Sequence, residues 1–316
     1  MTQVTGPARP QRADVADSYN LGVDAYEALW SPVILPPAAS LVRHLDLSGS
    51  GLVVDVGAGT GALLGAIRSA APAARTVALD ASARMLQVAR TRRGASAVMA
   101  DAVALPLADG CASAVILAYV LFHLPDPVRA LAEAARVLGP AGRAGTVTWG
   151  WERAPRASDM WSQILADAGV PPGPLRHADT GLDTPDAVAA TLRSAGLQPE
   201  RIWSQPLRRQ WDRSSYFRLA SGGGASRVRL SLVDSAARAE VLALLRRGLE
   251  QLSPGDLLWE GEVICAVATR SVSRTTNLTV PPGACLGRAK LGGWCDQTRR
   301  TRDARDRRAR LRTEAA

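Results

Sequence analysis

The chain has 316 residues, a formal net charge of +9 and a hydrophobic content of 47%, which is enough apolar material for a sizeable buried core. No apolar run reaches the roughly 18 residues of a membrane-spanning helix, and the N-terminus does not resemble a signal peptide. The four cysteines show neither metal-ligand spacing nor a paired framework. We therefore expect a protein of the reducing cytoplasm, with no bound metal and no membrane partner.

The first 50 residues divide into three parts. Residues 1–15 are polar and contain two prolines, so we expect them to be disordered. Residues 18–30 are predicted to form one or two short helices, whose aromatic side chains either anchor the segment or cover a ligand. These side chains are Tyr19, Tyr26 and Trp30. Ser31-Pro32 is expected to break the segment, and residues 33–45 read as a helix leading into the first strand.

A glycine-rich turn follows that strand. The run Val53-Val54-Asp55-Val56 is apolar apart from Asp55, and Gly57, Gly59 and Gly61 stand at alternate positions before a helical pattern. Glycine lets the backbone turn tightly and approach a ligand, and the free N–H groups of the next helix point toward it. The pattern is typical of a nucleoside-type cofactor site. A variant dinucleotide fingerprint ending at Ala62 and a turn without ligand are the alternatives.

The second strand ends in another carboxylate. Residues 75–80 finish at Asp80, which lies 19 residues after Gly61. At about this spacing a βαβ unit brings an acidic side chain to a ribose, and a carboxylate can accept hydrogen bonds from both ribose hydroxyls. Ser82 is predicted to cap the helix that runs to about Arg93.

Strands and helices alternate up to residue 150. We expect strands over residues 95–100, 114–117 and 144–149, a turn over residues 139–143, and a helix from Pro127 to Leu138 capped by Asp126. The alternation predicts an α/β fold with a Rossmann-like, doubly wound, mostly parallel sheet.

The pattern is weaker beyond residue 150. Helices are expected over residues 158–168, 184–195, 211–219 and 234–252, strands over residues 197–203 and 262–269, and a flexible loop over residues 221–225. Five tryptophans are predicted either to line an apolar acceptor site or to pack in the core: Trp149, Trp151, Trp161, Trp203 and Trp211.

The last 43 residues differ in composition. Residues 274–316 hold 11 basic and 4 acidic residues, a net charge of +7, which leaves about +2 for residues 1–273. We expect this tail to be disordered. It is either a polyanion-binding arm or an accessory extension, and the second interpretation is favoured because a charge block is only a compositional signal.

The segments around the glycine turn resemble class I S-adenosylmethionine (SAM)-dependent methyltransferases. Residues 79–86 are similar to the family's acid-x-Ser-x-x-Met-Leu pattern, and residues 105–109 to its Leu-Pro-x-x-Asp connection. Residues 119–127 resemble the His-His-Leu-x-Asp-Pro segment of methyltransferase type 11 and quinone-biosynthesis C-methyltransferases, with Phe122 replacing the first histidine. The resemblance covers about residues 15–270 and is specific over residues 53–150.

This resemblance implies a seven-stranded sheet of order 3-2-1-4-5-7-6 with an antiparallel last strand. The methyltransferase domain would span residues 16–270, with an α-helical lid over 16–50, a SAM-binding core over 51–150, and a small insertion with acceptor-side helices and strands six and seven over 151–270. Residues 271–316 would form the basic tail.

The resemblance also implies the cofactor S-adenosyl-L-methionine and its contacts. Tyr19 would lie near the methionine end of the cofactor, and Asp101 would accept a hydrogen bond from the adenine amino group. Met85 would either lie near the adenine or pack in the core. The full set of cofactor residues would be Tyr19, Asp55, Gly57, Ala58, Gly59, Gly61, Asp80, Ala81, Met85, Asp101, Ala102, Ala118, Tyr119 and His123.

The absence of two family motifs favours a small-molecule acceptor. Residues 118–121 read Ala-Tyr-Val-Leu where nucleic-acid amino-methyltransferases carry Asn/Asp-Pro-Pro-aromatic, and Cys111 lacks the context of a nucleophile. In-line displacement requires chiefly that the protein positions the acceptor and excludes water. His123 is the candidate general base, or a structural histidine that closes the cleft.

Three other functions remain open. They are an RNA methyltransferase that uses the basic tail, a NAD-dependent oxidoreductase, and a SAM-binding protein without catalysis. The oxidoreductase is disfavoured because residues 1–273 contain no lysine and therefore no Tyr-x-x-x-Lys dyad.

Overall fold

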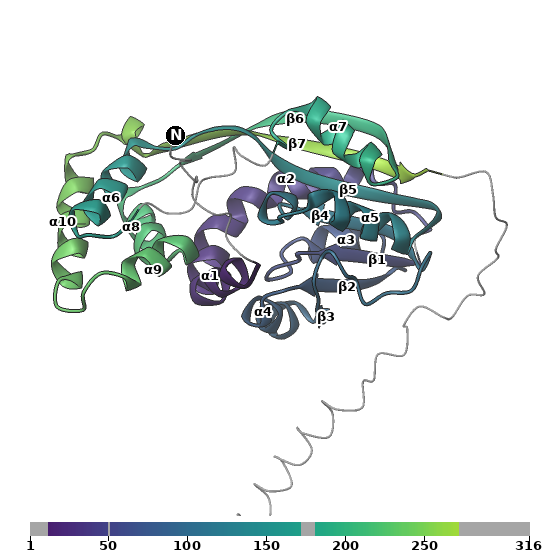
Figure 1. Ribbon diagram of the computed structural model, residues 1–316, viewed down its shortest axis with the longest axis horizontal. Coiled ribbons are helices and arrows are strands. Elements are labelled where there is room, and N and C mark those ends of the chain that lie inside the picture. The colour runs from purple at the N-terminus through teal and green to yellow at the C-terminus, as the bar shows by residue number, and fades with distance from the viewer. Residues whose placement is uncertain (1–11, 50, 172–180, 272–316) are drawn as a thin grey trace, which may run out of the picture.

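A seven-stranded sheet organises the computed structural model (Figure 1), which describes residues 12–49, 51–171 and 181–271. Its order is β3-β2-β1-β4-β5-β7-β6, as expected from the resemblance. Strands β1 to β5 are parallel, and β7 is antiparallel to both β5 and β6. The strands are β1 (Leu52–Val56), β2 (Arg75–Asp80), β3 (Ser96–Met99), β4 (Ala112–Ala118), β5 (Leu138–Arg153), β6 (Leu197–Gln210) and β7 (Leu258–Arg270).

Helices cover both faces of this sheet, and each face has its own apolar core. One core joins α2 (Ser31–His44) and α3 (Leu64–Ala70) to the sheet, and the other joins α5 (Pro127–Val137) and α7 (Pro185–Ser194). Every residue of β1 is buried, as expected for a central parallel strand with helices on both sides. The prediction of a doubly wound sheet is confirmed.

The local capping signals also act as predicted. The side chain of Ser82 accepts a hydrogen bond from the Met85 amide at the start of α4 (Ala83–Arg93). Asp126 accepts from the Arg129 amide at the start of α5. Thr184, the first residue of the helix predicted over residues 184–195, also caps α7, which was not predicted. Each cap binds an amide that has no partner within the first helical turn.

The N-terminal segment is more helical than expected. Helix α1 (Arg12–Ala25) begins inside the segment predicted to be disordered, so that prediction is wrong for residues 12–15; residues 1–11 lie outside the described residues. The π-helical turn η1 (Tyr26–Trp30) then leads directly into α2, so, contrary to the prediction, Ser31-Pro32 does not interrupt the helical segment. The Ser31 amide donates a hydrogen bond to the Tyr26 carbonyl, so the helical path continues up to Pro32 in the first turn of α2.

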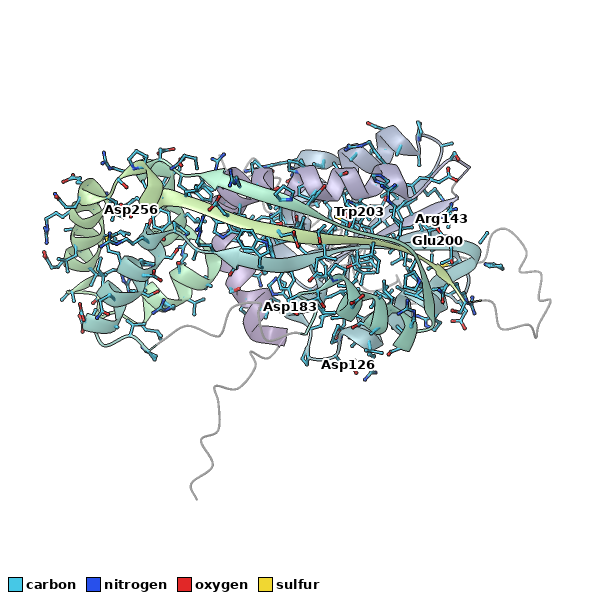
Figure 2. The ribbon with its side chains drawn as sticks, turned by 90° about the horizontal axis from the view of Figure 1, so that it is seen from above. Asp126, Arg143, Asp183, Glu200, Trp203 and Asp256 are labelled. Atoms are coloured by element: carbon cyan, nitrogen blue, oxygen red, sulfur yellow. The ribbon has the colours of Figure 1, made fainter. Side chains whose placement is uncertain are left out.

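A helical cap stands beyond the carboxyl ends of the parallel strands. Strands β5, β6 and β7 extend past the rest of the sheet and carry four helices at the left of Figure 1, which we call the cap. These helices are α6 (Arg156–Asp167), α8 (Arg213–Gly222), α9 (Gly224–Ser231) and α10 (Arg238–Gln251). In Figure 2, β6 and β7 extend between the core, where Trp203 lies, and the end of the molecule that holds the cap and Asp256.

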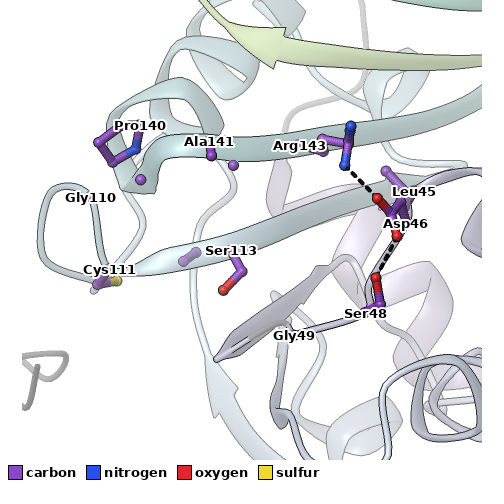
Figure 3. A pocket seen from close by; sticks show the side chains of 13 residues that line it. Leu45, Asp46, Ser48, Gly49, Gly110, Cys111, Ser113, Pro140, Ala141 and Arg143 are labelled. Carbon is purple, nitrogen blue, oxygen red and sulfur yellow. Dashed lines mark hydrogen bonds and ion pairs between the residues drawn. The ribbon is translucent and has the colours of Figure 1, made fainter.

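Two predictions about irregular segments are wrong. Residues 221–225, expected as a flexible loop, belong to α8, α9 and the single residue between them. The turn expected over residues 139–143 lies within β5 as a bulge, because Ala112 pairs with Leu138 while Ala114 pairs with Arg143. This bulge lines a pocket of about 430 Å³ (Figure 3). In the pocket, the guanidinium nitrogen Nη1 of Arg143 forms an ion pair with Oδ2 of Asp46 at 3.3 Å. The pocket is at the amino ends of β4 and β5, at the opposite edge of the sheet from the glycine turn.

Candidate active site

The glycine turn between β1 and α3 has the backbone that its sequence predicts. Gly57, Gly59 and Gly61 all have positive φ angles, of 68°, 55° and 77°, which other residues rarely adopt. A Cβ atom on Gly57 would lie 2.2 Å from a methyl carbon of Val120, so this glycine also permits close packing. A Cβ atom on Gly59 would meet only the phenol of Tyr26 within 4 Å, with the hydroxyl oxygen at 3.7 Å. The turn is therefore open at Gly59.

Asp80 is held firmly beside this turn. One carboxylate oxygen accepts a 2.8 Å hydrogen bond from the Gly59 amide, and the other accepts a 2.7 Å bond from the Ser82 amide. Burial raises the pKa of Asp80, while these backbone bonds oppose that increase. Each carboxylate oxygen has a second acceptor position. Asp80 can therefore hold the turn and still accept hydroxyl donors from a ligand.

Buried polar atoms around the turn have unused bonding capacity. Asp55, at the end of β1, is 2% exposed, and no described residue bonds its Oδ2. Burial, and secondarily the charge of Asp80, raise the pKa of Asp55 to about 7. The hydroxyls of Thr60 and Tyr119 are likewise buried without a described partner. Because unsatisfied buried polar atoms are costly, this group of atoms suits a polar ligand at the turn.

Two tyrosines of the lid reach into the same region. The hydroxyl of Tyr19 lies 3.0 Å from Nε2 of His123. The Tyr26 ring meets Tyr19 edge to face at 5.6 Å, and its hydroxyl lies beside Gly59. Burial raises the pKa of both phenols. Tyr19 was predicted as a cofactor residue from the sequence, whereas Tyr26 was predicted only to anchor the segment or to cover a ligand, although a spacing of seven residues places both on one helical face.

Polar contacts tie the lid to the core. Asn20 accepts hydrogen bonds from the Ser82 hydroxyl, at 2.7 Å, and from the Arg84 amide, at 3.2 Å. Glu27 forms an ion pair with Arg93, whose guanidinium also donates to a backbone carbonyl of the glycine turn. The sequence analysis missed Asn20 and Glu27, because their partners lie more than 60 residues away.

The other predicted cofactor residues lie at the carboxyl edge of the sheet, with one exception. Ala58 donates its amide to the Leu79 carbonyl, Ala81 is exposed after β2, and the carboxylate of Asp101 accepts from the Val103 amide. Ala102 follows Asp101, and Ala118 ends β4. Met85 is 1% exposed within α4. Its burial fits core packing, the second of the two roles considered for it.

His123 and Tyr119 stand just past β4. His123 ends the 3₁₀ turn Leu121–His123 and is half-buried, with Tyr19 and Phe122 as ring neighbours. Tyr119 has a φ of 60°, unusual for a residue with a side chain. Such strained positions concentrate at functional sites. The expected position of His123 at the carboxyl edge agrees with the structure, while its role as a base stays a prediction.

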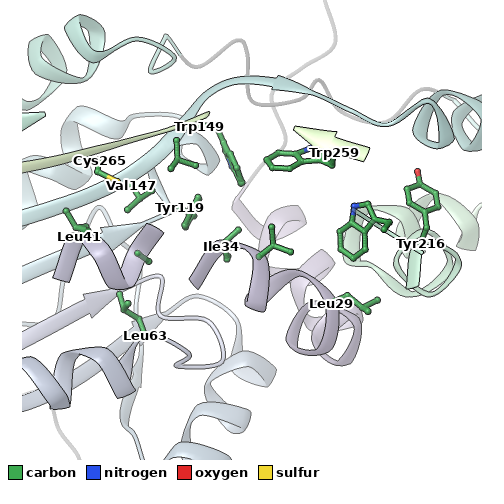
Figure 4. Close-up of a cluster of buried hydrophobic side chains, with 14 of the residues drawn as sticks. Leu29, Ile34, Leu41, Leu63, Tyr119, Val147, Trp149, Tyr216, Trp259 and Cys265 are labelled. Atoms are coloured by element: carbon green, nitrogen blue, oxygen red, sulfur yellow. The ribbon is translucent and has the colours of Figure 1, made fainter. Parts of the chain in front are cut away.

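Aromatic rings continue from this edge toward the cap (Figure 4). The ring centroid of Trp149 lies 4.9 Å from that of Tyr119 and 5.4 Å from that of Trp259. The Trp30 ring stacks on the Trp211 ring, with 6.2 Å between their centroids. Trp149 and Trp211 were predicted to line the acceptor site or the core, Trp30 was named only as an aromatic of the N-terminal segment, and Trp259 was not named. The three other selected tryptophans lie apart from this array. Trp161 is buried in the cap, Trp203 packs against His44, and Trp151 is 54% exposed.

The described residues contain no group of His, Cys, Asp or Glu side chains suited to a metal ion. In the same part of the chain, no helix combines the length and apolar character needed to cross a membrane.

Comparison with known proteins agrees with this fold and site. Residues 54–145 match the family model described as a methyltransferase domain. The chain is 32% identical over 173 residues to a malonyl-[acyl-carrier protein] O-methyltransferase of Methylococcus capsulatus, covering 53% of this chain and 59% of that protein. It is 38% identical over 96 residues to a demethylmenaquinone methyltransferase of Thermus thermophilus, covering 29% and 44%. The chain thus spans less than two thirds of each relative.

A solved structure extends the comparison to the whole fold. The [4+2]-cyclase SpnF superposes with a TM-score of 0.54 at 18% identity, over 85% of this chain and all of that one. That protein is named for a cyclisation, so this fold alone does not define the reaction. Residues 54–145, around the glycine turn, thus match a methyltransferase domain, and both of these relatives are methyltransferases. The resemblance to class I SAM-dependent methyltransferases is confirmed.

Proposed function

We propose that this protein transfers a methyl group from SAM to a small-molecule acceptor. One arrangement carries the proposal: an open glycine turn whose Gly59 amide is bonded by Asp80 and beside which Asp55 is buried without a described partner at Oδ2. A nucleoside with a vicinal diol and a cationic amino-acid end has groups that match these acceptors. The methyltransferase relatives support the same cofactor.

Each part of the cofactor would have a distinct set of residues. Asp80 would accept hydrogen bonds from the ribose hydroxyls, and Asp101 and the Ala102 amide would contact the adenine. Asp55 and Tyr19 would lie at the methionine end. When bound, SAM supplies a methyl group activated by its sulfonium. The protein's own contribution is to orient the acceptor and exclude water, for which the lid and the cap are placed at the carboxyl edge.

The acceptor side supports a small molecule rather than a nucleic acid. Tyr119 to His123 follow β4 in place of the polar amine-holding segment, and the rings of Tyr119 and Phe122 both neighbour Trp149. His123 would remove a proton where the acceptor must lose one. Its Nε2 shares a hydrogen bond with Tyr19, which would orient the ring. A cytoplasmic location is part of this proposal, and the buried thiol of Cys265 fits a reducing compartment.

Calorimetric titration with SAM, S-adenosylhomocysteine (SAH) and NAD(H) tests the proposal. We expect both adenosyl ligands to bind, NAD(H) not to bind, and removal of residues 274–316 to leave the affinities unchanged. Binding of NAD(H) alone would favour an oxidoreductase. SAM binding with no turnover across an acceptor panel would indicate a non-catalytic protein. Methyl transfer to RNA that disappears with the tail would favour the nucleic-acid alternative.

A further inference from the structure

Helix α1 and cap helix α9 touch backbone to backbone. A Cβ atom on Gly22 would lie 2.4 Å from the amide nitrogen of Gly224, and one on Gly224 would lie 2.5 Å from the Ser18 carbonyl oxygen. The Arg227 guanidinium adds a 3.1 Å hydrogen bond to the Leu21 carbonyl. Only glycine allows such an approach, so any side chain at these positions would push the two helices apart.

A second contact joins the lid to the cap. Trp30, the last residue of η1, stacks on Trp211 with an angle of 11° between the rings. Trp211 is 2% exposed and directly precedes the N-cap of α8. The π-helical turn therefore carries Tyr26 beside the glycine turn at one end and Trp30 against the cap at the other.

The two sides of α1 contact different parts of the protein. Ser18, Gly22 and Ala25, at helical spacings of four and three, meet the α8–α9 segment. Tyr19 and Asn20 contact the core, at His123 and Ser82. The helix thus lies between the cofactor side and the cap, as Figure 1 shows, and packs on both α9 and α4.

We propose that α1, η1, α8 and α9 move as one unit, so that a cofactor bound at the glycine turn also orders the cap over the acceptor side. This inference rests on the proposed cofactor. It predicts that cofactor binds before acceptor, because the acceptor side is ordered only once the lid is held against the turn. Binding at one site and order at the other are then linked reciprocally.

Hydrogen exchange of the full chain with and without SAH tests this coupling. We expect SAH to slow exchange in residues 12–30 and equally in residues 213–231, although α8 and α9 have no residue at the glycine turn. Slowed exchange in residues 12–30 with unchanged exchange in residues 213–231 would overturn the inference while leaving the proposed function intact. A failure of SAH to bind would remove the proposed function itself, and the inference with it.

A pair of variants locates the coupling. Gly22→Ala should separate α1 from α9, remove the protection of residues 213–231 and weaken SAH binding by about five- to tenfold, within the usual range for coupled sites. Gly65→Ala is the matched control, because it lies in helix α3 and a Cβ there meets no atom within 4 Å. It should behave as the wild type. Thermal unfolding checks that both variants fold. A folded Gly22→Ala protein that keeps the cap protection would contradict the proposal.

Discussion

The hydroxyl of Tyr19 on α1 lies 3.0 Å from Nε2 of His123, just past the end of β4. The two rings meet at 88°, so the bond and the ring contact act together. These residues are 104 positions apart in the chain. The lid therefore reaches the candidate base directly, and α1 contributes to the orientation of His123.

Loss of this bond should weaken cofactor binding modestly. Tyr19→Phe removes one hydrogen bond between the lid and the loop after β4, so we expect SAH affinity to fall by about 0.5–1.5 kcal/mol. Calorimetry measures the change. Ser113→Ala is the control, because it removes a 2.8 Å hydrogen bond from the Gly51 amide at the opposite edge of the sheet. Equal losses in the two variants would show that Tyr19 has no special role at the site.

We expect SAH binding to need both the open space beside Gly59 and the positive φ angle of its backbone. Both Gly59→Ala and Gly94→Ala place a side chain at a positive φ, of 55° and 59°, and should destabilise the fold by about 1 kcal/mol each. A Cβ on Gly94 meets no atom within 4 Å. We expect Gly59→Ala to weaken SAH binding, a bulkier residue at position 59 to abolish it, and Gly94→Ala to leave it unchanged. Wild-type affinity in the bulky variant would disprove the site.

Asp80 should contribute through both of its oxygens. Asp80→Ala is expected to weaken SAH binding by about 1–3 kcal/mol, because the ribose loses its acceptors and the Gly59 amide loses its partner. Asp80→Asn, which keeps one acceptor oxygen, should lose less. Asp167→Ala, at the exposed end of α6, controls for loss of a carboxylate. An unchanged dissociation constant for Asp80→Ala would contradict the assignment.

Buried Asp55 should make folding stability fall as pH rises toward neutrality. Its pKa is about 7 in the folded protein, against 3.8 for the free group. Between these values the folded state holds a proton that the unfolded state has lost, so stability decreases with rising pH and levels off above pH 7. From about pH 5 to about pH 8 the contribution is roughly 2–3 kcal/mol. Urea unfolding should show a smaller decrease for Asp55→Asn, and parallel curves would exclude this origin.

Local sequence patterns determined the core of the fold. Strand β1, the glycine turn, Asp80 at the end of β2 and the capping residues Ser82 and Asp126 all appear where predicted. Their signals lie within one turn, one strand or one βαβ unit, where steric preference and hydrogen bonding act between near neighbours. The resemblance to a family then supplied the strand order, which no local pattern contains.

The tertiary structure decided how the lid and the cap meet that core. Asn20 and Trp30 gain their partners from segments remote in the chain, so the sequence did not show that Asn20 bonds Ser82 or that Trp30 stacks on Trp211. Residues 221–225 were predicted to form a flexible loop because glycine is a poor helix former. Packing against Gly22 favours helix there instead, since only a residue without a side chain lets two helix backbones touch. The sequence by itself determined the glycine turn between β1 and α3. Only the packing of distant segments decided which residues of the lid and the cap lie over that turn.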